Sequence, residues 1–297
     1  MEAELLKRIR SLPGTELIGD DAAVIGDRII TVDMLTEGVD FILAETDPKW
    51  IGRKALAVNL SDIAAMGGEP RWIFVAVALP KHGALELAEQ LLAGMKPLID
   101  KYSLILAGGD TNTWDGGLIV SITVIGCVAE KGVFRRSGGK AGDRLLTTGK
   151  LGGSILQHQF SFEPRIDEAL YLNRHYEVHA AIDISDGLTL DLHRLATESR
   201  LGAILFETKI PIADDAVTLS GQSGRSPLDH ALSDGEDFEL LFSVAPQEAK
   251  KLLSLQPFQT TSGVILYDIG ELTATTGLQM VTADGISKPL IPQGFEH

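Results

Sequence analysis

One stretch indicates the fold most clearly, PKWIGRKALAVNLSDIAAMGG (48–68). Its apolar residues recur at helical spacing, a proline stands in the first turn, and two glycines close the run. The pattern predicts a helix from Pro48 to Met66, with Thr46 or Asp47 as its N-cap. Because a helix with such an apolar face must pack against a sheet or another helix, we expect a layered core.

Asp62 interrupts the apolar face of this helix. It continues the helical spacing of Ile51, Ala55 and Val58, so its carboxylate lies in line with the buried stripe. A carboxylate in that position either pays a desolvation cost or takes up a proton. Two interpretations remain open: backbone N–H groups or an arginine satisfy the charge, or a bound cation offsets it.

Short apolar runs alternate with helical patterns on both sides of this stretch. Strands are expected at Arg28–Val32, Trp72–Leu79, Leu104–Ala107, Leu118–Val128, Arg144–Thr148, Ala203–Phe206, Phe238–Val244 and Val264–Ile269, with further helices at Leu85–Tyr102 and ending near Ser199. The polar, glycine-rich segment 135–140 is the best candidate for a domain boundary. The alternation predicts an α/β fold with two domains, residues 1–137 and 138–297.

The composition excludes several kinds of partner and site. The chain has 297 residues, 26 of them basic and 41 acidic, for a net charge of −15. Such a charge repels polyanions, so nucleic acid is not an expected partner. Cys127 is the single cysteine, which rules out an intrachain disulfide and a cysteine metal cluster. The first residues lack a signal-peptide pattern and the longest apolar run (118–129) is short, so we expect a cytoplasmic protein without membrane contact.

Aspartates recur at the ends of apolar runs or beside glycine. The other segments are GDDAAV (19–24), ITVDML (30–35), AGGDT (107–111), AIDISDGL (181–188) and DGEDFEL (234–240). An enzyme that holds divalent cations against phosphate oxygens needs carboxylates from several elements converging on one cleft. Asp110 is expected in a loop at the carboxyl end of its strand, where ligands commonly bind.

Structural alternatives exist for single members of this set. Taken singly, Asp20 is better explained as a turn residue and Asp110 as a cap, and Ser185 or Asp186 can cap the following helix. Asp191 lies inside that helix, and we interpret it as a solvated or capping-network residue outside the site.

Two further segments carry positive charge or glycine. Arg135 and Arg136 stand out in so acidic a chain; they either lie exposed at a linker or bind nucleotide phosphate. The loop GKLGGS (149–154) lacks the spacing of a P-loop, although its backbone amides remain a candidate for contact with an anion.

Taken in order, these motifs resemble those of thiamine-monophosphate kinases, which belong to the superfamily typified by aminoimidazole ribonucleotide synthetase. The shared strings are GDDAAV, KALAVNLSDIAAMGG (54–68), GGDT (108–111), RSG (136–138), AIDISDGL and GEDFEL (235–240). The resemblance implies a two-domain α/β (α+β) fold of the aminoimidazole ribonucleotide synthetase type. It also implies a homodimer formed through the sheet of the N-terminal domain.

The same resemblance implies a site in the cleft between the domains, with ATP, several Mg²⁺ ions and thiamine monophosphate as acceptor. Carried over position by position, the metal set is Asp21, Thr31, the backbone of Val32, Asp33, Asp62, Asp110, Asp183 and Asp186. The nucleotide set is Gly109, Asp110, Arg136 and Ser185, and the acceptor set is Asp40, Glu236 and Phe295. The expected catalytic residues are Asp33, Asp62, Asp110 and Arg136.

The expected reaction is direct in-line phosphoryl transfer between two polyanions, with Mg²⁺ neutralising their charge. Three residues depart from the family pattern: Asp40 stands in place of histidine, Asp234 in place of glycine and Phe238 in place of tyrosine. These departures bear on the acceptor more than on the metals. Two alternatives remain, a sister enzyme of the superfamily with another acceptor and a non-catalytic nucleotide or metal sensor.

Overall fold

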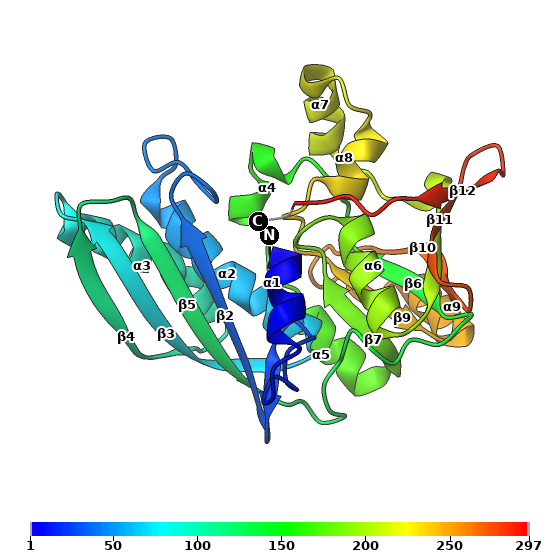
Figure 1. Cartoon of the computed structure of the whole chain (residues 1–297), viewed down its shortest axis with the longest axis horizontal. Coiled ribbons are helices and arrows are strands. Elements are labelled where there is room, and N and C mark those ends of the chain that lie inside the picture. The colour runs from blue at the N-terminus through cyan, green and yellow to red at the C-terminus, as the bar shows by residue number, and fades with distance from the viewer. Residues whose placement is uncertain (1, 296–297) are drawn as a thin grey trace.

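The computed structural model describes residues 2–295, the side chains of residues 2, 3, 6 and 7 excepted. Within this range two sheets are flanked by helices (Figure 1). The first sheet contains, in spatial order, β1 (Ala23–Ile25), β2 (Arg28–Thr36), β5 (Ile119–Cys127), β3 (Glu69–Pro80) and β4 (Ile105–Trp114). β3 and β4 pair in parallel, whereas the other neighbours are antiparallel.

The second sheet is built from the rest of the chain. Its spatial order is β12 (Ser287–Leu290), β11 (Gly277–Val281), β8 (Gly202–Phe206), β10 (Leu266–Thr273), β6 (Arg144–Thr148), β9 (Leu240–Val244) and β7 (Val178–Asp183). The helices of this half are α4 (His158–Ser161), α5 (Ile166–His175), α6 (Leu188–Glu198), α7 (Asp214–Ser223), α8 (Pro227–Ser233) and α9 (Pro246–Leu255), and α1 (Glu2–Ile9) precedes the first sheet. The apolar stripe of α6 packs into the core of this half.

The helix α2 (Pro48–Ala65) connects the two halves. The side chain of Asp47 caps it by accepting a hydrogen bond from the Lys49 N–H at 2.9 Å, and Gly67 follows its end. α2 packs against β2 and β5 of the first sheet and also against α4, α5 and β7 (Figure 1). Ser61, in its last turn, donates a hydrogen bond to Asp183 at 2.6 Å. The end of α2 therefore lies at the end of β7.

Glycine allows α2 to pack closely against α3 (Ala84–Lys101). A Cβ atom at Gly52 would lie 2.1 Å from the carbonyl oxygen of Leu91, and one at Gly94 would lie 1.8 Å from that of Lys49. No larger residue fits at either position without moving a backbone, so the two glycines determine how closely the helices approach.

The structure confirms the α/β class and most of the predicted elements, including α2, α3, α6 and β6. The strand predicted at Leu104–Ala107 ends too early, because pairing with β3 holds Gly108 and Gly109 in a strand that continues to Trp114. Sequence reasoning did not identify α4, α5, α7, α8, α9, β1, β7, β11 or β12, most of which are too short to show a clear period. The division of the chain at residue 137 stays a prediction. None of the described helices combines the length and apolar character that a membrane crossing demands.

Candidate functional site

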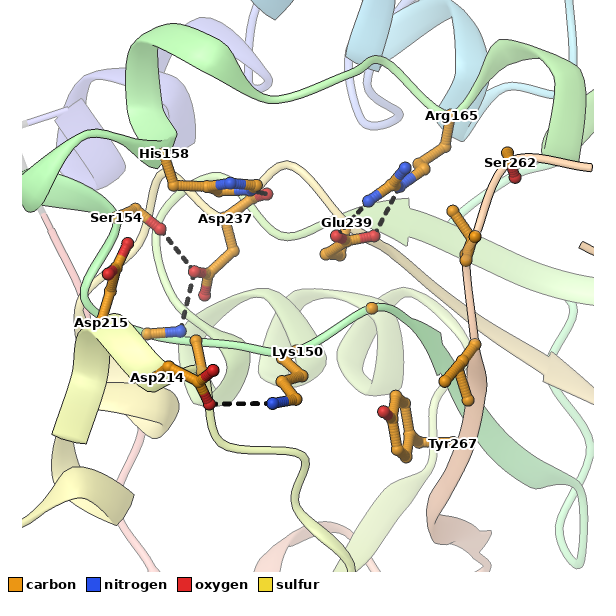
Figure 2. Close-up of a pocket in the computed structure, with 16 residues that line it drawn as sticks. Lys150, Ser154, His158, Arg165, Asp214, Asp215, Asp237, Glu239, Ser262 and Tyr267 are labelled. Carbon is orange, nitrogen blue, oxygen red and sulfur yellow. Dashed lines mark hydrogen bonds and ion pairs between the residues drawn. The ribbon is translucent and has the colours of Figure 1, made fainter. Parts of the chain in front are cut away.

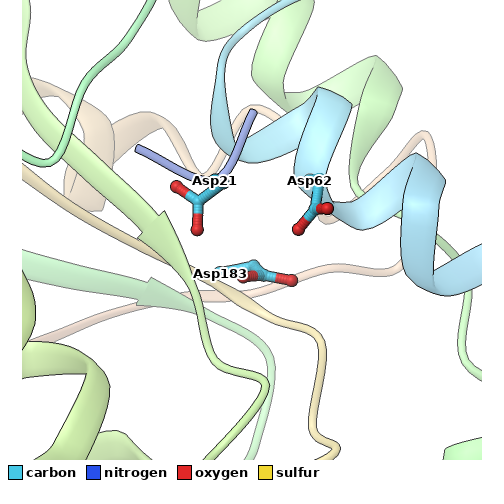
Figure 3. Close-up of side chains that lie close together, drawn as sticks. All are labelled: Asp21, Asp62 and Asp183. Atoms are coloured by element: carbon cyan, nitrogen blue, oxygen red, sulfur yellow. The ribbon is translucent and has the colours of Figure 1, made fainter. Parts of the chain in front are cut away.

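Three carboxylates from distant parts of the chain meet between the two sheets. Asp21 comes from the loop before β1, Asp62 from the last turn of α2, and Asp183 from the last position of β7 (Figure 3). One oxygen atom from each lies within 4.8 Å of the others. All three belong to the set predicted to bind metal, and the fold brings them together. We call them the aspartate cluster.

The strand β2 adds two residues at the border of the aspartate cluster. The hydroxyl of Thr31 donates a hydrogen bond to Asp62, and the charge of Asp33 acts on Asp62 from the same strand. The backbone N–H of Asp33 donates to Asn59 Oδ1 at 3.1 Å. Since residues two apart in a strand face the same side, Thr31 and Asp33 both face α2. The side chain of Val32 points away and is 63% exposed, so any contribution to the cluster would come from its backbone.

Negative charge accumulates here without sufficient compensation. Burial and then the neighbouring charges, Asp33 first, raise the pKa of Asp62 well above its ordinary value. Burial and then Asp21 do the same to the pKa of Asp183. Burial and then Asp186 raise the pKa of Asp33 to about 6. These shifts have one physical meaning: the protein by itself does not stabilise all of these groups as carboxylates. A bound cation reverses that balance.

Arg136 places a positive charge against the aspartate cluster. Its Nη2 donates to Asp21 Oδ1 at 2.6 Å, while the neighbouring Arg135 pairs with Asp20 at the same distance. Asp20 also accepts the backbone N–H of Arg136 at 2.9 Å. Among the described residues, Asp21 Oδ2 and Arg136 Nε are buried and have no hydrogen-bond partner. An acceptor and a donor therefore remain available for ligands inside the site.

The turn between β7 and α6 holds Ser185 and Asp186. Gly187 occupies the N-cap position, so the interpretation of Ser185 or Asp186 as the cap is wrong. The fully buried Asp191 instead accepts the N–H groups of Asp186 and Gly187 at 2.9 and 3.1 Å and pairs with Arg194 at 2.7 Å. The predicted capping role of Asp191 is therefore confirmed, and the alternative that its side chain is exposed to solvent is wrong. Arg194 also pairs with the carboxylate of Asp186.

Asp110 does not join the aspartate cluster within one chain. β4 is three positions from β2 in the sheet, which corresponds to about 14 Å at the usual strand spacing. Across the sheet Asp110 is in register with Ala76, Ser121 and Met34, and Met34 is 61% exposed. Asp33, adjacent to Met34, faces the opposite side. The predicted loop position of Asp110 beside the other ligands is therefore wrong for the single chain.

Two of the three predicted acceptor residues lie around Lys54, a residue that sequence reasoning missed. Lys54 Nζ lies 2.5 Å from Glu236 Oε1 and donates to the backbone carbonyl of Asp40 at 3.1 Å. The third, Phe295, is half exposed, and its N–H donates to the carbonyl of Asp186 at 2.9 Å. The signal available in the sequence was a lysine within an otherwise apolar stretch of helix.

The loop GKLGGS (149–154) has a structural role. The N–H of Gly152 donates to Asp237 at 2.8 Å, that of Gly153 to Asp234 at 3.1 Å, and that of Leu151 to a backbone carbonyl at 2.8 Å. The expectation that the amides of this loop contact an anion is therefore wrong for these three, which already have partners within the protein.

This loop borders a cavity of about 430 Å³ beside the second sheet (Figure 2). Two nitrogens of Arg165 donate to Glu239 at 2.7 and 2.5 Å, and Thr148 donates to the same carboxylate at 2.5 Å. Asp237 accepts from Ser154 at 2.6 Å, and burial raises its pKa to about 8. Glu239 of this cavity thus receives a guanidinium and a hydroxyl from the protein, whereas in the aspartate cluster the guanidinium of Arg136 pairs with Asp21, and no ion pair of Asp62 or Asp183 is found among the described residues.

Comparison with known proteins agrees with the fold and the motifs. The family models described as AIR synthase related protein, N-terminal domain and C-terminal domain, match residues 19–128 and 131–282. The chain is 42% identical to a thiamine-monophosphate kinase of Rhodopirellula baltica, across 99% of this chain and 95% of that protein. It is 34% identical to a thiamine-monophosphate kinase of Methanospirillum hungatei, across 100% and 99% of the two chains.

Solved structures show the same similarity. One described as AaThiL complexed with AMPPCP and TMP has a TM-score of 0.85 and 26% identity, across 100% of this chain and 96% of that one. The thiamine-monophosphate kinase of Stenotrophomonas maltophilia has a TM-score of 0.75 and 31% identity, across 96% and 94%. From these matches along nearly its whole length, the chain belongs to the thiamine-monophosphate kinase family, within the AIR synthase related proteins.

Proposed function

We propose that this protein transfers the γ-phosphate of ATP to the phosphate of thiamine monophosphate, forming thiamine diphosphate and ADP. One observation carries the proposal: three carboxylates, only one of them paired with a guanidinium among the described residues, converge between the two sheets of a chain that is 42% identical to a thiamine-monophosphate kinase. Carboxylates gathered in this way suit chemistry on phosphate groups that arrive with divalent cations.

The donor atoms of the aspartate cluster fit Mg²⁺. All are oxygens, the ligands that hard divalent cations prefer, and Asp21 Oδ2 is buried with no partner among the described residues. We assign the metal positions to Asp21, Asp33, Asp62 and Asp183, with Thr31, Val32 and Asp186 at the border. When bound, Mg²⁺ supplies positive charge against the phosphates of both substrates.

The protein's own residues orient the reactants. Arg136 Nε is a buried donor without a partner in the described part of the chain, and we assign it to a phosphate oxygen of the nucleotide. Ser185 and Gly109 remain predicted nucleotide contacts. Glu236 and Asp40, held on either side of Lys54, are assigned to the acceptor. Holding both phosphates in line, away from bulk water, is the main catalytic task that remains for the protein.

The transfer requires no general base from the protein. The phosphate oxygen of thiamine monophosphate is largely ionised near neutral pH, since the second pKa of a phosphate monoester is about 6. That oxygen forms a bond to the γ-phosphorus of ATP. At the same time the bond between the γ-phosphorus and the oxygen that bridges the β- and γ-phosphates breaks. ADP leaves with the electron pair, and no covalent enzyme intermediate forms.

A coupled assay of ADP release tests this function. With ATP, Mg²⁺ and thiamine monophosphate we expect turnover and stoichiometric thiamine diphosphate, and with unphosphorylated thiamine no product. Release of ADP with a different acceptor instead would point to a sister enzyme. Tight Mg²⁺-dependent binding of ATP without transfer to any acceptor would point to a sensor. Either result contradicts the proposal.

We further propose that the protein is a homodimer formed through the first sheet. Helices α2 and α3 cover one face of this sheet, while the other exposes Val32 and Met34 of β2 and Phe74 of β3. Apolar side chains gathered on one sheet face are typical of an interface. Asp110 lies on that face too, so we assign it to the site of the second copy. The cytoplasmic location of the protein also stays a prediction.

Two measurements test the dimer. Met34→Asp should give a monomer by light scattering, whereas Leu85→Asp, a matched change at a 74% exposed leucine of α3, should leave the dimer intact. Mixing Asp110→Asn with Asp62→Asn, each inactive alone, should restore activity, because heterodimers contain one site with both aspartates. A mixture that stays inactive after confirmed subunit exchange would contradict the assignment of Asp110 to the second copy.

A further inference from the structure

Lys54 is buried in the middle of α2, with 0% of its side chain exposed. A fully buried ammonium requires compensation by charge and by hydrogen-bond acceptors. Its Nζ has three: Glu236 Oε1 at 2.5 Å, Gln159 Oε1 at 2.7 Å and the carbonyl oxygen of Asp40 at 3.1 Å. An ammonium has three N–H donors, so these partners use all of its donor capacity. Lys54 therefore has no donor left for a substrate.

The three partners come from three separate parts of the chain. Asp40 lies in the loop after β2, Gln159 lies in α4, and Glu236 lies in the loop before β9. The ring of Phe160, next to Gln159, lies 5.2 Å from Lys54 Nζ and adds a cation–π contact. One buried charge of the N-terminal half thus holds two segments of the C-terminal half and one segment of its own.

The backbone around Glu236 has an unfavourable conformation that needs stabilising contacts. Glu236 has a φ of +55° and Phe238 a φ of +49°, in the left-handed region that residues with a side chain seldom adopt. The backbone N–H groups of these two residues donate to the carbonyls of Ser185 and Ile184 at 2.7 and 2.8 Å. A strained conformation of this kind persists where surrounding contacts over-determine it. The pair with Lys54 is the contact that fixes the direction of the Glu236 side chain.

We propose that Lys54 is a positioning residue for acceptor binding, which assembles the acceptor side of the site by holding Glu236, the Asp40 loop and α4 in one arrangement. The inference rests on the proposed function, because it takes Glu236 and Asp40 as acceptor residues. It goes beyond that function in making acceptor affinity depend on a side chain that never touches the acceptor. Lys54 makes no contact with the aspartate cluster among the interactions described, so ATP binding is left largely unchanged.

The test compares Lys54→Met with Lys49→Met, a matched change at an exposed lysine of the same helix. Loss of the charge-assisted hydrogen bonds should raise KM for thiamine monophosphate by about tenfold to a hundredfold in Lys54→Met, with KM for ATP changed less than about twofold. Lys49→Met should resemble the wild type in both constants. Lys54→Arg keeps the charge and should recover part of the acceptor affinity. An unchanged KM for thiamine monophosphate in folded Lys54→Met would overturn the proposal.

Two further variants keep the test decisive if Lys54→Met does not fold. Gln159→Leu removes one acceptor of the ammonium and keeps the charge pair, so KM for thiamine monophosphate should rise several-fold while KM for ATP stays constant. The double variant Lys54→Arg/Glu236→Gln should raise KM for thiamine monophosphate by less than the two single changes combined, because both changes act through the same ion pair. Full additivity, or equal rises in both KM values, would overturn the positioning role. A wild type without thiamine monophosphate kinase activity would instead contradict the proposed function, so the two failures are distinguishable.

Discussion

Asp62 and Asp183 of the aspartate cluster differ from Glu239, beside the cavity of the second sheet, in how their charge is compensated. In the aspartate cluster, Asp62 and Asp183 have raised pKa values, and Asp21 keeps one oxygen without a partner in the described residues. Beside the cavity of the second sheet, Glu239 is held by two nitrogens of Arg165 (Figure 2). It also accepts a hydrogen bond from Thr148. The residue types are nearly the same, but their partners are not.

On the proposed function, this difference separates a binding site from a structural one. A buried carboxylate that the protein pairs with a guanidinium needs nothing more, and removing its partner costs stability. Several buried carboxylates that raise one another's pKa destabilise the ligand-free protein and favour whatever cation neutralises them. The comparison predicts that substitutions in the aspartate cluster change activity, whereas substitutions around the cavity change stability.

The largest expected effect comes from Asp62→Asn. Turnover should fall by about a thousandfold or more, because the cation and the phosphates lose a ligand inside a buried site. The melting temperature measured without Mg²⁺ should stay the same or rise, since a poorly compensated carboxylate is removed. Steady-state kinetics and calorimetry measure the two effects, with Asp115→Asn, at an 83% exposed aspartate, as the matched control. Near-normal Mg²⁺-dependent turnover would contradict the mechanism.

Arg165→Met should give the next largest effect, on stability. The variant leaves Glu239, 2% exposed, without its guanidinium, and breaking a buried pair in this way costs about 3–5 kcal/mol. Urea unfolding measures the loss, and Arg174→Met, at an exposed arginine of α5, should change it by less than about 0.5 kcal/mol. Equal stability of the two variants would contradict the assignment of Arg165 as the group that compensates the charge of Glu239.

Mg²⁺ should stabilise the protein through the aspartate cluster. A ligand present at a hundred times its dissociation constant adds about 2.7 kcal/mol to the free energy of unfolding. We expect Mg²⁺ to raise the melting temperature of the wild type in line with this gain in stability. The melting temperature of Asp21→Asn should change little with Mg²⁺. Differential scanning calorimetry across a Mg²⁺ titration measures this, with Na⁺ at matched ionic strength as control. A shift of the same size in Asp21→Asn would place the ion elsewhere.

A further prediction concerns the dependence of stability on pH through Asp237. Burial, opposed by hydrogen bonds from Ser154 and Gly152, raises the pKa of Asp237 from its ordinary value of 3.8 to about 8. Between these values the folded protein keeps a proton that the unfolded chain releases, so this group's contribution to stability falls as pH rises from about 4 to 8. Asp237→Asn retains the hydrogen-bond acceptor and removes the titration. Its melting temperature should therefore decline less than that of the wild type between pH 5 and 8, and an identical decline would contradict the assignment.

The aspartate cluster was predictable because each of its carboxylates lies at a recognisable position in the local sequence pattern. Asp62 follows the apolar stripe of one helix, and Asp183 ends an apolar run before a helix. Asp110 was misplaced for a physical reason: two glycines suggested the end of a strand, whereas pairing with β3 extends that strand past them. Local propensity is a weak guide where a ladder of hydrogen bonds competes with it.

From its sequence alone, this chain reveals its α/β class, the helix α2 with its cap, and the aspartates that the fold gathers into one cluster. These features depend on spacing and residue type within short segments, and such local patterns are readable without the fold. Tertiary structure alone decides that Lys54 holds Glu236 and Asp40, that Arg165 satisfies Glu239, and that Asp110 faces away from the cluster. These relations join residues far apart in the chain, and they exist only once packing has chosen which buried charges meet.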